Sequence, residues 1–201
     1  MATAISAKDV KELRDSTGAG MMDCKRALEE TGGDKEKAVD LLRSRGAAKA
    51  AKREAKAANE GVIATYIHHN GKLGVMVELN CETDFVANTD AFRQLARDLA
   101  MHVASARPLA VNANDIPADV VARERSVYVA EVAEQGKPEN VRDRIVEGKM
   151  KKFFQESVLL EQPFVKDPER TIQDLITEIS ARTGEKIGVA RFARFQLGQS
   201  D

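Results

Sequence analysis

Several features that would assign a function class at once are missing from this sequence of 201 residues. No uncharged apolar run is long enough to span a membrane. Residues 1–7 are mildly polar and lack the apolar segment of a signal peptide, so we expect a cytoplasmic protein. The two cysteines, Cys24 and Cys81, lie far apart and match neither a metal-binding spacing nor a disulfide framework.

A net charge of either sign is also missing. Lys and Arg number 31 against 32 Asp and Glu residues, so no overall field attracts nucleic acid to the chain. The composition, 43% hydrophobic and 31% charged, is that of an ordinary globular protein. The length allows one larger domain, or one ordinary domain with a small one beside it.

Motifs of catalysis are absent as well. The sequence contains no glycine-rich phosphate loop, no nucleophile elbow and no zinc-protease helix motif. His68 and His69 are neighbours on a predicted strand, so their side chains point to opposite faces and do not readily share a metal ion. They are better explained as polar residues beside a turn. We therefore expect a protein that acts by contact, not an enzyme, with no metal site and no cofactor.

Residues 1–45 predict a small domain of three short helices. Ser6 can cap the first helix and Asp34 the third, and the glycine-containing turn 16–20 separates the first two. Apolar residues recur at helical spacing in each helix: Val10 and Leu13, then Met21, Cys24 and Leu28, then Ala38, Leu41 and Leu42. Three such short helices bury little surface, so this domain is only marginally stable alone.

Residues 46–59 predict an exposed helical connector, because this segment is rich in Ala and Lys and has no large apolar residue. The stretch 43–56 carries six basic residues against one acidic residue. A solvated linker face explains this charge best, since no aromatic residue for base stacking is interleaved. A surface that contacts the phosphates of RNA is the alternative.

The remaining chain, 60–201, opens with a predicted β-hairpin. Residues 62–67 and 73–79 are strand-like and contain β-branched residues, and Asn70-Gly71 between them predicts a two-residue type I′ turn. In this register one face carries Val62, Ala64, Tyr66, Val75, Val77 and Leu79. The opposite face is mixed and could be covered by a helix or by another subunit; it carries Ile63, Thr65, Ile67, Met76 and Glu78.

Helices and one further strand are predicted after the hairpin. The helices are marked by the stripe Phe92, Leu95, Leu99 and Val103, by starts at Pro117 and Pro138, and by Ile172, Leu175, Ile176 and Ile179. Residues 187–197 predict a third strand. The fold class is therefore α+β, a small antiparallel sheet packed by helices. His102 lies at the edge of the apolar stripe, either as a hydrogen-bonded core residue or as an interface contact.

The run Thr83-Asp84-Phe85-Val86 follows the second predicted strand. Thr and Asp favour a turn, yet two apolar residues follow them directly. Apolar residues on a tight connection usually lie in the core, and the pattern alone favours this interpretation. The alternative is a projecting tip in which a carboxylate beside an aromatic ring anchors an interface.

Two long motifs resemble the signatures of the elongation factor Ts family. They are residues 13–25, Leu-Arg-Asp-Ser-Thr-Gly-Ala-Gly-Met-Met-Asp-Cys-Lys, and residues 80–87, Asn-Cys-Glu-Thr-Asp-Phe-Val-Ala. Shorter stretches agree with the family in the same order: 66–70, 100–103, 147–153 and 162–165. The resemblance covers nearly the whole chain.

The resemblance implies a guanine-nucleotide exchange factor for the translational GTPase elongation factor Tu, bound in its nucleotide-free and GDP forms. It implies a ubiquitin-associated-like fold for the N-terminal domain, with Met21 and Met22 in the segment that docks on the GTPase. Asp84 and Phe85, within the run 83–86, would form a wedge that dislocates Mg²⁺. Further implied contacts are His102 and the pair Leu73-Gly74.

The family resemblance also bears on assembly. This chain has a single core module and is similar to the short members of the family, which implies a homodimer. Cys81 would then lie either at the dimer seam or, as is usual in a reducing compartment, buried in the core. The alternative function is a translation accessory protein that contacts RNA or the ribosome through the basic residues 43–56; direct binding of nucleic acid is otherwise not expected.

Overall fold

A computed structural model of the protein describes residues 5–51, 53, 56–136 and 138–199. The chain divides into two compact units, each built from segments that are distant in sequence. One unit lies within 1–62, 80–93 and 175–188, and the other within 63–79, 94–174 and 189–201. The predicted boundaries 1–45, 46–59 and 60–201 follow chain order and stay a prediction.

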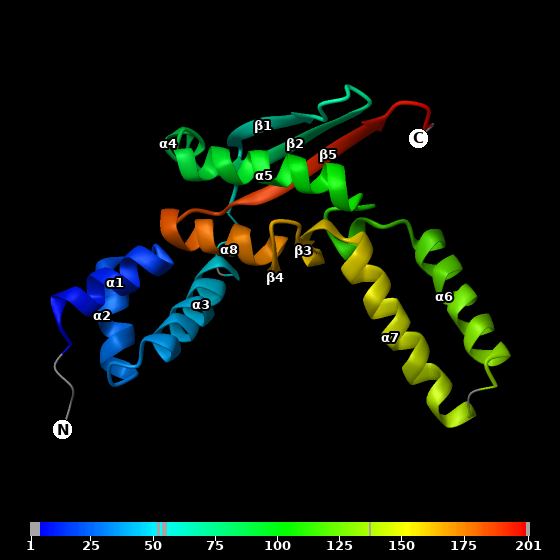
Figure 1. The fold of residues 1–201 in the computed structure, drawn as a ribbon, viewed down its shortest axis with the longest axis horizontal. Helices are drawn as coiled ribbons and strands as arrows, with labels where there is room; N and C mark the ends of the chain where they lie inside the picture. The colour runs from blue at the N-terminus through cyan, green and yellow to red at the C-terminus, as the bar shows by residue number, and fades with distance from the viewer. Residues whose placement is uncertain (1–4, 52, 54–55, 137, 200–201) are drawn as a thin grey trace. The chain divides into compact units, whose positions relative to one another are not determined.

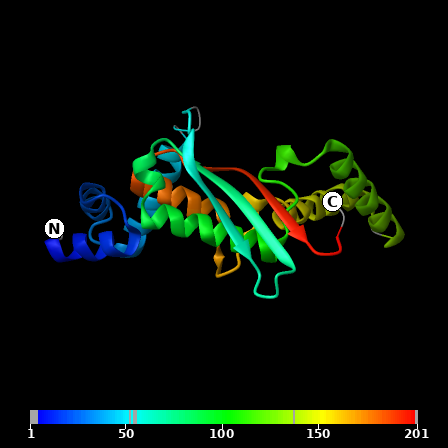
Figure 2. The same cartoon turned by 90° about the horizontal axis from the view of Figure 1, so that it is seen from above.

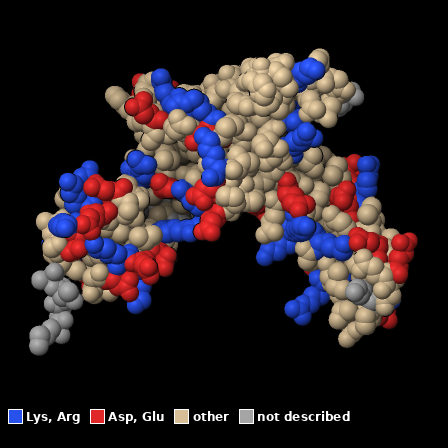
Figure 3. Space-filling view, viewed as in Figure 1, with Lys and Arg blue, Asp and Glu red and all other residues tan. Residues whose placement is uncertain are grey.

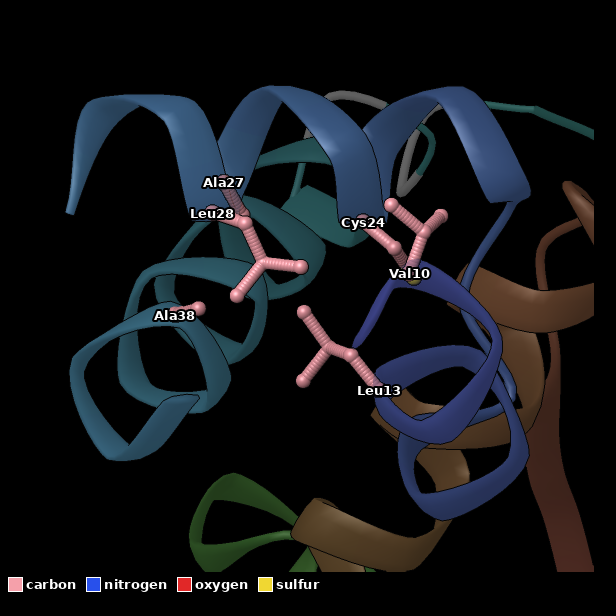
Figure 4. Close-up of a cluster of buried hydrophobic side chains, with 6 residues drawn as sticks. All are labelled: Val10, Leu13, Cys24, Ala27, Leu28 and Ala38. Carbon is pink, nitrogen blue, oxygen red and sulfur yellow. The ribbon is translucent and has the colours of Figure 1, made fainter. Parts of the chain in front are cut away.

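The three predicted N-terminal helices are confirmed as α1 (Ala7–Thr17), α2 (Met21–Glu30) and α3 (Lys35–Ala51). Ser6 caps α1 by accepting the Asp9 N–H at 3.1 Å, and Gly18 ends it in the left-handed conformation that glycine adopts readily. Their small shared core is shown in Figure 4 and consists of Val10, Leu13, Cys24, Ala27, Leu28 and Ala38.

The connector 46–59 is only partly helical. Helix α3 continues to Ala51, as predicted, but residues 56–59 are not in a helix. The Lys56 N–H closes a turn on the Arg53 carbonyl at 2.9 Å, and the Lys186 side chain binds the Lys56 carbonyl. These contacts outside the helix explain why the helical propensity of Ala and Lys does not decide the structure here.

The predicted hairpin is confirmed, with a different turn. Strands β1 (Glu60–Ile67) and β2 (Leu73–Cys81) are in the predicted register, since the His68 N–H binds the Leu73 carbonyl at 2.9 Å. The turn is closed by a hydrogen bond from the Gly71 N–H to the His68 carbonyl. This closure lies one residue earlier than in a type I′ turn at Asn70-Gly71. The Asn70 side chain accepts the Lys72 N–H, which stabilises this longer loop.

The third predicted strand is β5 (Gly188–Gln196), and the sheet order is β1-β2-β5. Leu197 bonds to Lys72 while Arg191 bonds to Glu78, so β5 runs antiparallel to β2. Figures 1 and 2 show helix α5 (Asp90–Ala106) lying along one face of this sheet. The buried residues on that side are Val75, Val77 and Leu79 of the sheet and Leu95, Leu99 and Val103 of the helix.

The other face of the sheet is exposed. The predicted outer residues Ile63, Ile67 and Met76 are all exposed, and Phe195 of β5 and Leu197 beyond it join them. Within the described part of the chain, the sheet is therefore covered on one side only. This leaves an apolar outer face, which we define as Ile63, Ile67, Met76, Phe195 and Leu197.

Two long helices follow α5. Helices α6 (Ala118–Glu134) and α7 (Glu139–Ser157) each begin directly after the predicted proline, and they pack together around Val132, Val146 and Met150 (Figure 1). Short 3₁₀ turns lie at Ala113–Asp115 and Leu159–Glu161. The small ladder of β3 (Pro163–Phe164) and β4 (Asp167–Thr171) was not predicted, and α8 (Ile172–Thr183) precedes β5.

His102 of α5 and Gln162 form a buried polar pair. The Gln162 amide nitrogen donates to the Ala106 and Glu156 carbonyls, so its oxygen faces His102 Nε2 at 2.9 Å and accepts the proton there. His102 Nδ1 accepts the Val165 N–H at 3.3 Å, which requires a neutral ring. Of the two sequence-based alternatives, His102 is the hydrogen-bonded core residue. Burial lowers its pKa, against the Gln162 hydrogen bond.

This environment predicts a stability that falls with acid. Below the ordinary histidine pKa of about 6.5, the unfolded chain takes up a proton at His102 that the folded chain refuses, so stability is lost as the pH falls toward the lowered value. We expect His102 to contribute a loss of about 1 kcal/mol between pH 7.5 and 5.5. Urea unfolding followed by circular dichroism measures it, with His102→Gln as the comparison. Equal pH dependence in both proteins would contradict the assignment.

Candidate functional site

The tip, residues 83–86, projects at the end of β2. Thr83 caps the four-residue helix α4 (Asp84–Ala87), its hydroxyl oxygen accepting the Val86 N–H at 3.4 Å. Phe85 is 82% exposed, whereas Val86 is only 8% exposed. The interpretation that the pattern favoured, burial of both residues, is thus correct for Val86 and wrong for Phe85. Successive helical residues point in different directions, so one side chain anchors the tip and the next one projects.

The tip is held by a turn that lies 102 residues further along the chain. The Glu82 and Thr83 N–H groups donate to Glu185 Oε2 at 3.1 and 3.0 Å, and the Thr83 hydroxyl donates to Glu185 Oε1 at 2.6 Å. In return, the Lys186 N–H donates to Glu82 Oε1 at 2.7 Å. Sequence analysis missed Glu82, Glu185 and Lys186, because no local pattern connects residues so far apart.

The base of the tip is polar and charge-paired. Lys56 Nζ lies 2.7 Å from Glu82 Oε2. This hydrogen bond, and that from the Lys186 N–H, hold the pKa of the Glu82 carboxyl below its usual range. Glu82 is therefore an ionised anchor at neutral pH.

Cys81 lies buried beneath the tip. Its thiol donates to the Thr83 carbonyl at 3.1 Å, and burial raises its pKa. The protonated thiol is the poorly reactive form, so the residue acts in packing. Within this chain it is the buried packing cysteine of the two sequence-based alternatives.

The other predicted contact residues have different surroundings. Met21 and Met22, in the first turn of α2, are 52% and 62% exposed, so two large apolar side chains lie free on the surface. Leu73 and Gly74 open β2 and are half-buried; a side chain at position 74 would meet Ile67 Cδ1 at 3.1 Å. His102 has no exposed surface.

The basic segment 43–56 is partly neutralised within the chain. Arg45 pairs with Glu30 at 2.6 Å and Lys56 with Glu82 at 2.7 Å, while Lys52 and the Lys49 side chain lie outside the described residues. Figure 3 shows positive and negative side chains interspersed over the N-terminal helices and over the α6–α7 pair. No extended field of one sign appears on the face in view.

Signs of a metal centre or a membrane span are lacking in the part of the chain that the structure describes. No group of three His, Cys, Asp or Glu side chains there could hold a metal ion. None of the described helices has the length and apolar character needed to cross a bilayer. The tip, which is exposed at Phe85 and held by hydrogen bonds to Glu185, is the feature that most clearly suggests a binding site.

Comparison with known proteins identifies the family. The family model described as elongation factor TS matches residues 27–199. The elongation factor Ts of Syntrophobacter fumaroxidans is 56% identical over 198 residues, covering 98% of this chain and 99% of that protein. Those of Desulfosudis oleivorans and Carboxydothermus hydrogenoformans are 57% and 54% identical over 195 residues, covering 97% of this chain and 98% and 90% of theirs. The chain therefore belongs to the elongation factor Ts family of translation elongation factors.

Proposed function

We propose that this elongation factor promotes release of GDP from the GTPase elongation factor Tu by inserting Asp84 and Phe85 near the Mg²⁺ and phosphates of the nucleotide. The observation that carries the proposal is the exposure of Phe85 on a tip that its own chain holds in place. A large aromatic side chain that is exposed in the free protein suits binding, because its burial against a partner stabilises the complex.

The tip offers two kinds of contact that suit displacement. Phe85 supplies apolar volume, and Asp84 beside it supplies an exposed carboxylate at the start of α4. Mg²⁺ requires near-octahedral ligand geometry at short distances, so small shifts of the GTPase elements that hold its ligands weaken the bound ion. Weakened Mg²⁺ loosens the phosphates that it bridges. The tip thus acts mechanically and performs no covalent chemistry.

Thermodynamic linkage sets which form of the GTPase binds best. If this protein lowers the affinity of the GTPase for GDP, then GDP lowers the affinity for this protein by the same factor. The nucleotide-free GTPase is therefore the tightest partner, and the GDP form is the one on which exchange begins. Asp84 and Phe85 provide the differential contact that such a shift requires.

Further contacts complete the proposed interface with the GTPase. The exposed pair Met21 and Met22 suits docking of the N-terminal helices. Leu73 and Gly74 are proposed to contact the region near the phosphate loop. His102 is proposed to act on the same region through the segment that it holds, since its ring binds the backbone of the half-exposed Val165.

We also propose that the chain forms a homodimer through the apolar outer face of the sheet. Five large apolar side chains are exposed on one side of a three-stranded sheet whose other side is already covered. Large apolar side chains exposed together on one face suit an interface, and a second identical face is a complementary partner for it. Two copies would bring two core modules into one assembly.

Nucleotide release tests the tip. With elongation factor Tu carrying fluorescent GDP and excess unlabelled nucleotide present, wild-type protein should accelerate the loss of fluorescence. Asp84→Ala and Phe85→Ala should each slow the accelerated release at least tenfold, since truncated hot-spot residues cost about 2 kcal/mol or more. Asp119→Ala and Val129→Ala, exposed positions on α6, serve as controls. A wild-type protein that does not accelerate release would refute the function, and fully active tip variants would refute the site.

The molar mass in solution tests the dimer. Light scattering at micromolar concentration should give twice the mass of the 22.0 kDa chain. Met76→Lys, on the central strand of the outer face, should raise the dissociation constant at least tenfold, because an added charge would have to be buried at the interface. Val129→Lys is the control. The dimer proposal fails if the wild type has the mass of a monomer or if Met76→Lys stays fully dimeric.

A further inference from the structure

The Glu185 carboxylate binds the tip directly. It accepts three hydrogen bonds from two adjacent residues, through the Glu82 and Thr83 N–H groups and the Thr83 hydroxyl. Hydrogen bonds to a charged acceptor are shorter and stronger than those between neutral groups. The shortest of the three, at 2.6 Å, comes from the hydroxyl that caps α4.

The hydrogen bond from the Thr83 hydroxyl to Glu185 fixes the orientation of the hydroxyl group that caps α4. An ionised carboxylate can only accept, so the single Thr83 hydroxyl proton points to Glu185. The lone pairs of the same oxygen are then free to accept the Val86 N–H, which begins α4. Glu185 therefore acts through Thr83 on the helix that presents Phe85.

Glu185 is itself firmly placed. Helix α8 ends at Gly184 in the left-handed conformation, with the Gly184 N–H on the Ser180 carbonyl at 2.9 Å. The buried Ser180 hydroxyl donates to the Glu185 carbonyl at 2.5 Å, and the Glu185 N–H donates to the Thr183 hydroxyl oxygen at 3.4 Å. The carboxylate thus projects from a turn with few conformations open to it.

A second set of hydrogen bonds joins the base of the tip to the turn after α8 and does not involve the Glu185 side chain. Glu82 binds the Lys186 N–H and the Lys56 ammonium, each at 2.7 Å. Loss of the Glu185 carboxylate should therefore leave the segments attached while the tip loses its cap geometry. The expected defect is local to the tip.

We infer that Glu185 is a positioning residue that holds the tip in the conformation that presents Phe85. It removes the cost of ordering the tip from the binding step, as pre-organised binding loops do. Its effect on exchange rests on the proposed function, whereas its effect on the order of the tip does not. Without the carboxylate, only a fraction of molecules presents the tip, and the apparent affinity for the GTPase falls by that fraction.

Exchange kinetics provide the first test, with Glu185→Gln. The side-chain amide has a single acceptor oxygen, so it cannot serve both the two backbone N–H groups and the Thr83 hydroxyl proton, and it lacks the charge that strengthens these hydrogen bonds. We expect the half-saturating concentration of this protein in GDP release to rise about tenfold, corresponding to a presented fraction of about one tenth, with the maximal rate within twofold. Phe85→Ala, which removes the contact itself, should lower the maximal rate. Glu169→Gln, an exposed position on β4, should change neither.

Proteolysis provides a second test that needs no GTPase. Chymotrypsin cuts after exposed aromatic residues where the backbone opens locally, so the cleavage rate after Phe85 reports the open fraction of the tip. We expect Glu185→Gln to raise this rate about tenfold while the urea midpoint of the whole chain stays that of the wild type. Glu169→Gln should again match the wild type.

The two tests separate the possible failures. Faster cleavage in Glu185→Gln, with a wild type that does not accelerate GDP release, refutes the proposed function and leaves the positioning role supported. Unchanged cleavage and an unchanged half-saturating concentration overturn the positioning role. So does a lowered urea midpoint with a reduced maximal rate, because that result indicates a general structural defect.

Discussion

The burial of one face of the sheet on helix α5 is the constraint on which the rest of the structure depends. Val75, Val77 and Leu79 leave water on that side, and the alternation of a strand then sends their neighbours to the other side. Because that other side carries Ile63, Ile67 and Met76, which are all exposed, the sheet keeps an apolar outer face. Strand β2 ends at Cys81, and the tip follows it directly.

The tip is stabilised chiefly by polar contacts, and this suits a contact surface. A short connection of this size has little apolar area to bury, and here Val86 is its buried apolar residue. Charged hydrogen bonds from a distant turn supply the order that a core would supply elsewhere. Phe85 is thereby left out of the fold and remains available to a partner.

Much of this architecture could be predicted from the sequence, and the failures have physical reasons. Strand alternation identified both faces of the hairpin and its register, because one face must be buried. The turn type escaped prediction, since the Asn70 side chain stabilises a longer loop that propensity does not distinguish. Phe85 and Val86 have similar hydrophobicity, and only the direction of each on α4 separates them. Glu185 could not be found, because its partners are brought to it by the fold alone.

The different environments of Phe85 and Val86 have a consequence for how the sequence of the tip can change in evolution. Val86 is buried and contributes to stability, whereas Phe85 is 82% exposed and buries little surface within the chain. Selection for a stable fold therefore exerts almost no pull on position 85, and only a partner can maintain an aromatic residue there. A lineage that lost its partner would drift first at this position, and the chain would stay folded while it did.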